Sequence, residues 1–220
     1  MDKINLLNID VVIYNKNCQD GLTSAYIFKY FCEKNNKNID LIPCYHKGEE
    51  LNLNELKNKN VIMVDIMTDN YEDIKNICNN MIILDHHKTA LNKYKNENYI
   101  LLDMTKCGAV LSYEYCDKEV VPKFIKCIQA RDLWLWDEEY AEEFTTGYFE
   151  KSNNKNLDNY KLFKNLMNDK KLLLFNEIVE YGKELINIKN NKIKELFKKI
   201  KIVNVKILNT EKTYNIIKFN

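Results

Sequence analysis

Acidic side chains follow the apolar runs in the first half of the chain. Asp65, Asp85 and Asp103 each come directly after such a run, and Asp20 lies in the segment after the first run. If the runs are parallel strands, ligands bind outside their carboxyl ends, where these four side chains would meet. Because carboxylates on one rim repel each other unless a cation lies among them, we expect a metal site at this edge.

Two adjacent histidines, His86 and His87, directly follow Asp85. Carboxylate and imidazole ligands together suit Mn²⁺, Zn²⁺ or Fe²⁺ better than Ca²⁺. A shared aspartate is the usual way to hold two metals ~3.5–4 Å apart. A single aspartate after a strand is more often a helix cap or a turn former, so the prediction rests on the whole set.

Two further segments contain residue types that suit an anion. In residues 17–25, Gly21 permits a tight turn, and the amides at the start of the following helix would point at an anion. Residues 130–136 contain the only arginine, Arg131, both tryptophans, and Asp132, which can complete a metal shell. The planar fork of Arg131 holds a phosphate better than lysine does. The alternatives are an ordinary strand–helix turn and a surface Arg–Asp pair beside core tryptophans.

Apolar runs and helix-like stretches alternate over the first ~105 residues, which predicts an α/β fold with right-handed crossovers. The runs are continuous, as in strands buried on both faces of a parallel sheet. We expect a parallel five-stranded sheet flanked by helices, with strands at 11–14, 41–44, 61–64, 81–84 and 99–102 and helices at 20–35, 71–79 and 87–96.

The pattern becomes helical after Thr105, which we expect to cap a helix over residues 106–116. Further predicted elements are helices at 122–130, 137–144 and 176–199, a linker at 151–156, and a terminal hairpin of strands 202–208 and 213–219. We therefore expect one domain over residues 1–150, followed over residues 151–220 by a helical linker and a short hairpin.

Composition excludes several classes of protein. The chain has 220 residues, 45% hydrophobic content and a net charge of +1, which is a globular balance. Lysine is spread along the whole sequence, which argues against binding long nucleic acids. No apolar run reaches the ~20 residues that cross a bilayer, and the first residues lack a signal-peptide pattern. Seven cysteines without a C-x-x-C spacing indicate reduced thiols and a cytoplasmic location. The oligomeric state stays open.

Five short motifs occur in an order that resembles the DHH phosphoesterase superfamily. They span roughly residues 11–136 and are most similar to the branch of oligoribonucleases and cyclic-nucleotide phosphodiesterases. Any one motif is weak, whereas five in order are specific. The motifs are Asn17-Cys18-Gln19-Asp20-Gly21, Val64-Asp65, Asp85-His86-His87-Lys88-Thr89-Ala90, Cys107-Gly108-Ala109 and Arg131-Asp132-Leu133-Trp134.

The resemblance implies a phosphohydrolase with two Mn²⁺ ions, with Mg²⁺ or Co²⁺ as alternatives. One metal would be bound by Asp20, Asp65, His86 and Asp132, with Asp65 bridging to the other. Asp85 would orient His86 from behind. The residues implied to face the substrate are His87, Lys88, Thr89, Gly108 and Arg131.

The chain departs from the family pattern beside the first strand. The wider superfamily has His-x-x-x-Asp-x-Asp there, and this chain has Tyr14 and Cys18 at the His and the middle Asp. In the resembling branch a cysteine such as Cys18 is usual, and a histidine commonly stands where this chain has Asn15. Asn15 and Cys18 are thus the remaining candidate metal ligands. The Gly-Gly-Gly-His loop of the family's usual C-terminal domain does not occur in the sequence. The resemblance thus implies a catalytic domain over residues 1–150, and a helical linker and short hairpin remnant of a second domain over residues 151–220.

These residues predict hydrolysis of phosphodiester bonds in short oligonucleotides or small nucleotides by a metal-activated water. One alternative is a nucleotide-binding module that keeps the pocket but is catalytically impaired, because of Asn15 and the missing second domain. Another is an activity like that of an inorganic pyrophosphatase. Trp134 and Trp136 favour a nucleobase over pyrophosphate if they lie near the site.

Overall fold

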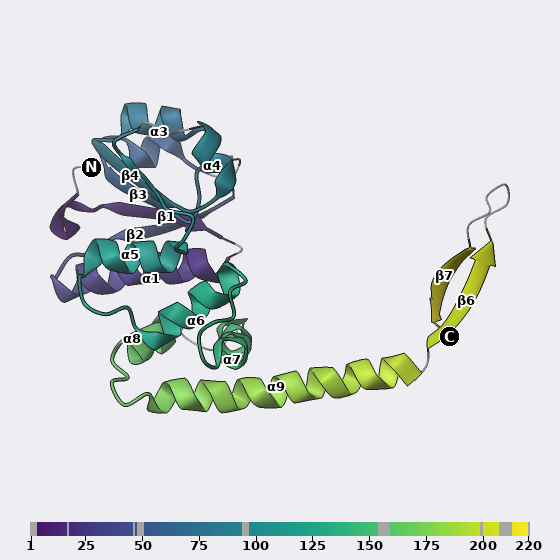
Figure 1. The fold of residues 1–220 in the computed structure, drawn as a ribbon. Helices are drawn as coiled ribbons and strands as arrows, with labels where there is room; N and C mark the ends of the chain where they lie inside the picture. The colour runs from purple at the N-terminus through teal and green to yellow at the C-terminus, as the bar shows by residue number, and fades with distance from the viewer. Residues whose placement is uncertain are drawn as a thin grey trace.

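The structure is a computed structural model that describes residues 4–16, 18–45, 47, 51–93, 97–153, 159–198, 200–206 and 213–219. Its first part is a parallel sheet between helices, and its second part is helical and ends in a hairpin (Figure 1). This arrangement confirms the predicted α/β class.

All five predicted strands are present, within one or two residues of the expected ends. They are β1 Val11–Asn15, β2 Asp40–Cys44, β3 Asn60–Val64, β4 Asn80–Asp85 and β5 Ile100–Leu102. The order is β2-β1-β3-β4-β5, and each pairing is parallel. Chain connections run outward in opposite directions from the β1–β3 pair, which makes the carboxyl ends of these strands the switch point of the sheet.

Each face of the sheet is covered by helices (Figure 1). On one face lie α1 Gln19–Lys34 and α5 Gly108–Cys116, where Ala25 and Phe28 pack on Val12 and Ile62. On the other face lie α2 Leu53–Leu56 and α3 Tyr71–Ile77. A short helix, α4 Lys88–Lys93, follows β4. Side chains that are buried from both faces explain why the strand sequences are continuous apolar runs.

A second apolar cluster joins α1 and α5 to four later helices. These are α6 Lys123–Asp132, α7 Ala141–Asn153, α8 Asn159–Met167 and α9 Leu173–Lys198. Phe163 of α8 and Phe175 of α9 are fully buried in this cluster with Phe144 of α7. Residues beyond 150 thus pack on the first part of the chain, and a domain boundary near residue 150 stays a prediction.

Several predicted elements differ from the structure. Thr105 does not cap α5; its hydroxyl and its amide both donate to the carboxylate of Asp103. The helix expected over 137–144 begins only at Ala141 and continues to Asn153, because the acidic residues before it form turns. Residues 151–153 of the expected linker are therefore helical, and residues 154–156 lie outside the described residues. The sequence analysis also missed α2, α8 and the 3-10 turn Leu6–Asn8.

The terminal hairpin has antiparallel strands, β6 Ile200–Lys206 and β7 Thr213–Phe219. The first strand was predicted over 202–208, of which residues 207–208 lie outside the described residues. It lies at the far end of α9, away from the five-stranded sheet (Figure 1). None of the helices in the described ranges combines the length and the apolar character needed to cross a membrane.

Candidate metal centre

The switch point of the sheet brings three strand-end carboxylates together, as the sequence predicted. Asp20 lies in the first turn of α1 after β1, Asp65 directly follows β3, and Asp85 ends β4. All three are almost completely buried, and Asp20 and Asp65 are each only 1% exposed. Buried carboxylates without compensating partners are costly, so their partners define the site.

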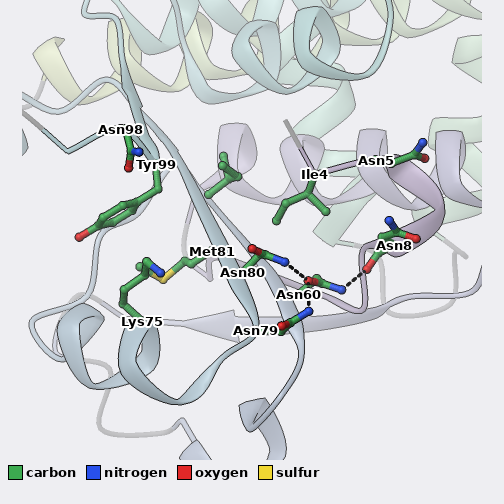
Figure 2. A pocket seen from close by; sticks show the side chains of 11 residues that line it. Ile4, Asn5, Asn8, Asn60, Lys75, Asn79, Asn80, Met81, Asn98 and Tyr99 are labelled. Carbon is green, nitrogen blue, oxygen red and sulfur yellow. Dashed lines mark hydrogen bonds between the residues drawn. The ribbon is translucent and has the colours of Figure 1, made fainter. Parts of the chain in front are cut away.

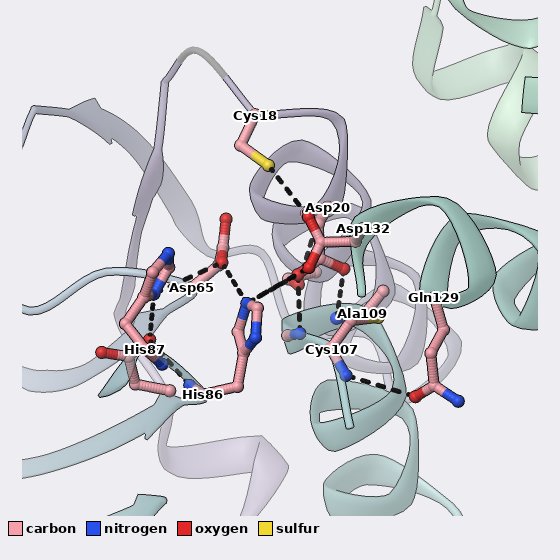
Figure 3. A network of polar contacts seen from close by, with 12 residues as sticks. Cys18, Asp20, Asp65, His86, His87, Cys107, Ala109, Gln129 and Asp132 are labelled. Atoms are coloured by element: carbon pink, nitrogen blue, oxygen red, sulfur yellow. Dashed lines mark hydrogen bonds and ion pairs between the residues drawn. The ribbon is translucent and has the colours of Figure 1, made fainter. Parts of the chain in front are cut away.

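Asp65 leaves the strand conformation as soon as β3 ends. Its φ is +55°, in the left-handed region that Asp enters more readily than most residues, while its amide still donates to Leu84 O at 3.0 Å. This bend directs the carboxylate of Asp65 toward Asp20 and His86 (Figure 3). Strained backbone of this kind clusters at functional sites.

Asp20 is fixed by the start of α5. Its two carboxylate oxygens accept hydrogen bonds from the amides of Gly108 and Ala109, at 2.6 and 2.8 Å. An anion is favoured there because the first amides of a helix lack partners within the helix. A Cβ atom at Gly108 would lie 2.8 Å from Asp20 Oδ2 and 2.8 Å from Asp65 Cβ, so this position requires glycine. The amide of Gly108 thus holds a candidate ligand, and the predicted contact of Gly108 with substrate stays a prediction.

The ring of His86 lies at the centre of the cluster (Figure 3). Its Nε2 is 3.0 Å from Asp65 Oδ1, 3.4 Å from Asp132 Oδ2 and 3.7 Å from Asp20 Oδ2. Asp132 is the last residue of α6 and lies far in the sequence from Asp20, Asp65 and His86. The structure therefore brings together the four residues that the sequence assigned to one metal.

Asp85 has a different partner from the one expected. Its Oδ1 accepts a hydrogen bond from His87 Nδ1 at 2.7 Å and from the backbone amides of His86 and His87. A carboxylate only accepts, so the ring of His87 carries its proton on Nδ1. Asp85 thus orients His87 directly, and it reaches His86 only through the backbone.

Two groups of side chains could each hold a metal ion. They are Asp20, His86 and Asp132, and Asp65, His86 and His87. Because one imidazole nitrogen binds one metal, His86 can serve only one of them, whereas Asp65 has two oxygens and can serve both. Within the described part of the chain, Asp65 Oδ2 and Asp132 Oδ2 are buried without a hydrogen-bond partner. These orphaned oxygens and the mixed carboxylate–imidazole set fit divalent transition metals such as Mn²⁺.

Without a cation, burial and mutual repulsion shift the pKa values of the carboxylates in the cluster, and the carboxylates shift that of His86. Burial raises the pKa of Asp20 to about 8, and the charges of Asp65 and Asp132 act in the same direction. Burial also raises the pKa of Asp132. For His86, burial opposes the charged form, but the hydrogen bond to Asp65 and the surrounding carboxylates raise its pKa to about 9. The cluster therefore retains protons that a bound cation would replace.

Some predicted residues lie at the edge of this cluster or outside it. Asp103 follows β5, and its amide donates to Asp85 O, but its carboxylate caps the turn at Thr105. Cys18 Sγ lies 3.9 Å from Asp132 Oδ1, and burial strongly raises the pKa of its thiol. Asn15 ends β1 and packs against Gly21, where a Cβ atom would lie 2.6 Å from Asn15 O.

The other residues predicted to bind substrate lie on the open side of the site. Lys88 and Thr89 are exposed in the first turn of α4. Arg131 is exposed near the end of α6 and lines a cavity of about 530 Å³ that also includes Asp20 and Asp132. Sequence reasoning missed several residues of this cavity, among them Phe149 of α7 and Lys189 of α9, because no spacing in the sequence links them to the motifs.

A second cavity, of about 590 Å³, lies at the opposite, amino-terminal ends of the strands (Figure 2). Its amide side chains bond to one another: Asn79 and Asn80 both donate to Asn60 Oδ1. Lys75 is the one charged side chain among the described residues that line it. This cavity lacks the titratable cluster of the carboxyl edge.

Comparisons with known proteins agree with this geometry. Residues 10–148 match the family model described as DHH family, N-terminal domain. The chain therefore belongs to the DHH family, whose members are generally metal-dependent phosphoesterases.

Two similar proteins carry no assigned activity. The chain is 36% identical over 165 residues to "Uncharacterized protein R106" of Acanthamoeba polyphaga mimivirus, covering 68% of this chain and 39% of that protein. A crystal structure of an uncharacterized protein from Helicobacter pylori G27 has a TM-score of 0.59 at 19% identity, covering 82% of this chain and 62% of that one. This structural likeness shows the fold alone. The chain spans less than two thirds of either protein.

Proposed function

We propose that this chain is a metal-dependent phosphodiesterase that hydrolyses short oligonucleotides or small nucleotides. The observation that carries the proposal is the cluster of Asp20, Asp65, His86 and Asp132, in which Asp65 Oδ2 and Asp132 Oδ2 are buried without a hydrogen-bond partner and Asp20 and Asp132 line the cavity. In this proposal Asp20, His86 and Asp132 would hold one metal ion, and Asp65 would serve both that ion and a second one. Bound Mn²⁺ would supply Lewis acidity and lower the pKa of a water.

The remaining residues of the chain are proposed to bind and orient the phosphate. His87 donates Nδ1–H to Asp85, which fixes the ring and raises the pKa of His87. Because the raised pKa favours the protonated form, the ring of His87 would suit a phosphoryl oxygen that gains charge during the reaction. Lys88 at the start of α4 and Arg131 at the end of α6 add positive charge on either side of the cluster.

A second candidate function is nucleotide binding without turnover. It is favoured by the neighbours of Asp20: Asn15 offers only an amide, and burial keeps Cys18 a neutral thiol. Neutral amide and thiol groups are weaker ligands for Mn²⁺ than carboxylate or imidazole.

The test is release of mononucleotide from a 5′-phosphorylated diribonucleotide, with and without Mn²⁺, for wild type and Asp65→Asn. Asp103→Asn is the matched control, because Asp103 lies at the same edge of the sheet but outside the cluster. We expect Mn²⁺-dependent release that Asp103→Asn keeps and Asp65→Asn loses. Cyclic nucleotides and pyrophosphate are assayed in parallel. Wild type that is inactive on every substrate with Mn²⁺, Mg²⁺ and Co²⁺ would overturn the proposal, and nucleotide binding without turnover would favour the second candidate.

A further inference from the structure

The cavity beside the candidate metal centre has a second wall, of which the proposed function uses only Arg131. Its volume of about 530 Å³ lies within the usual range for small-molecule sites. This wall includes the aromatic and cationic side chains Arg131, Trp134, Trp136, Phe149 and Lys189, from α6, the α6–α7 loop, α7 and α9. Ile128, Thr146 and one carboxylate, Glu142, also line it. Three aromatic rings and two cations thus face a carboxylate cluster across one cavity.

The two tryptophans are held toward solvent by an unusual backbone. Trp134 is 78% exposed and Trp136 is 41% exposed, so neither is a core residue. Their φ angles are +56° and +51°, which bulky residues rarely adopt. The turn is fixed because the amides of Leu135 and Trp136 both donate to Ala130 O. The rings meet edge to face, 5.8 Å apart, so Trp136 supports Trp134 and leaves much of Trp134 uncovered.

Polar groups surround the exposed rings. The guanidinium of Arg131 lies 5.8 Å from the centre of the Phe149 ring, a cation–π contact that holds it beside the cavity. Lys189 reaches the cavity from α9 and adds a second cation. Gln19 also lines the cavity, and its buried Nε2 has no hydrogen-bond partner among the residues with described positions. Flat rings, cations and an unused amide donor together match a base joined to a phosphate.

We infer, resting on the proposed function, that this wall is a nucleotide subsite in which a nucleobase stacks on Trp134 while Arg131 and Lys189 hold its phosphate toward the metal centre. Stacking on an aromatic ring accepts every base, because every base has a π face. The subsite is therefore tolerant of base identity and selective against phosphates that carry no base.

Tryptophan fluorescence tests this subsite without any turnover, because Trp134 and Trp136 are the only tryptophans of the chain. Asp65→Asn protein is titrated with adenosine 5′-monophosphate, with uridine 5′-monophosphate and with ribose 5-phosphate. We expect saturable quenching by both nucleotides. Ribose 5-phosphate, which has the phosphate but no base, is expected to bind about ten- to hundredfold more weakly.

Variants of the loop separate stacking from a general structural effect. Trp134→Ala is expected to weaken nucleotide binding about ten- to hundredfold, measured by the fluorescence of the remaining Trp136. Trp134→Phe keeps a flat ring and is expected to retain most of the affinity. Leu135→Ala is the matched control, because Leu135 is half exposed in the same loop and does not line the cavity. It is expected to bind like the parent. Because these side chains are exposed, none of the changes removes a core contact.

Failure of this inference is distinguishable from failure of the proposed function. Equal binding of ribose 5-phosphate and adenosine 5′-monophosphate, or unchanged affinity in Trp134→Ala, would overturn the subsite even if the enzyme hydrolyses diribonucleotides. Base-dependent quenching in a protein that hydrolyses nothing would support the subsite and leave the hydrolysis proposal contradicted.

Discussion

The two walls of the cavity are built in opposite ways. On the proposed catalytic wall, Asp20 lines the cavity, and His86 joins it to the buried Asp65. These three side chains come after separate strands and are held by amides and by one another. On the aromatic wall, Arg131, Trp134 and Trp136 are almost contiguous in sequence and face solvent.

The difference reflects what each wall must hold. Like charges placed together repel, so a carboxylate cluster needs rigid elements and exact donors to keep its geometry. A stacked base requires only an accessible flat ring, which a short strained loop can present. Changes in the first wall should therefore affect metal binding and turnover, whereas changes in the second should affect substrate affinity.

The largest effect is expected from Asp65→Asn. Removing the one carboxylate placed to serve both metal groups should lower kcat for a diribonucleotide by more than about a hundredfold, since even residues behind metal ligands contribute 10–100-fold. Steady-state kinetics at saturating Mn²⁺ measures this change in kcat, with Trp134→Ala assayed in parallel. Trp134→Ala should mainly raise KM. If Asp65→Asn changed mainly KM and Trp134→Ala mainly kcat, the distinction between the two walls would be wrong.

Gly108→Ala should damage the catalytic wall without altering any ligand. The new Cβ would lie 2.8 Å from Asp20 Oδ2 and from Asp65 Cβ, so the carboxylates must shift. Small displacements of catalytic groups reduce rates about a hundredfold. Mn²⁺ affinity by calorimetry and kcat should both fall, while nucleotide quenching in the metal-free protein should stay unchanged. Full activity in this variant would show that the α5 amides do not set the geometry.

Asp85→Asn should reduce kcat by about 10–100-fold, because Asp85 orients His87 through the 2.7 Å hydrogen bond. His87→Ala added to Asp85→Asn should change the rate little further, since both act through one ring. A double-mutant cycle measures the coupling. Additive losses would mean that Asp85 acts through His86 instead, as the sequence first suggested.

The smallest effect concerns stability of the metal-free protein. The pKa of Asp20 rises to about 8 and that of His86 to about 9 in the folded chain, so both bind more protons folded than unfolded. Raising the pH from about 6.5 to 8 therefore destabilises the metal-free fold, by roughly 1 kcal/mol per pH unit. Thermal unfolding should show a falling midpoint over this range, and Mn²⁺ should raise it most at pH 8. A midpoint that rises with pH would contradict the assignment.

The sequence was sufficient for the catalytic wall and insufficient for the aromatic one. Continuous apolar runs that end in Asp placed Asp65 and Asp85 at one edge, because parallel strands align their carboxyl ends. The sequence analysis gave Asp85 the wrong partner. Adjacency in the sequence does not show whether the ring of His86 or that of His87 folds back to bond Asp85. Exposure of Trp134 depends on a positive φ, and the approach of Lys189 depends on how α9 packs on α7. Neither leaves a pattern in the sequence.

Helix boundaries failed for a related reason. Tertiary contacts set the start of α5, because the carboxylate of Asp20 caps it from 88 residues away while Thr105 turns to Asp103. Likewise, α7 continues as far as Asn153, into the expected linker, and Gly147 and Gly182 let it pack closely against α9. Neither contact can be inferred from the helix propensity of the local sequence.

The central claim is that the strand-end cluster holds the catalytic metal. Crystals of the chain grown with Mn²⁺ and measured for anomalous scattering locate the metal directly. We predict one peak among Asp20, His86 and Asp132 and a second beside Asp65. In Asp65→Asn crystals we predict one peak or none. Anomalous peaks that lie elsewhere, or no peak at the cluster at millimolar Mn²⁺, would contradict it.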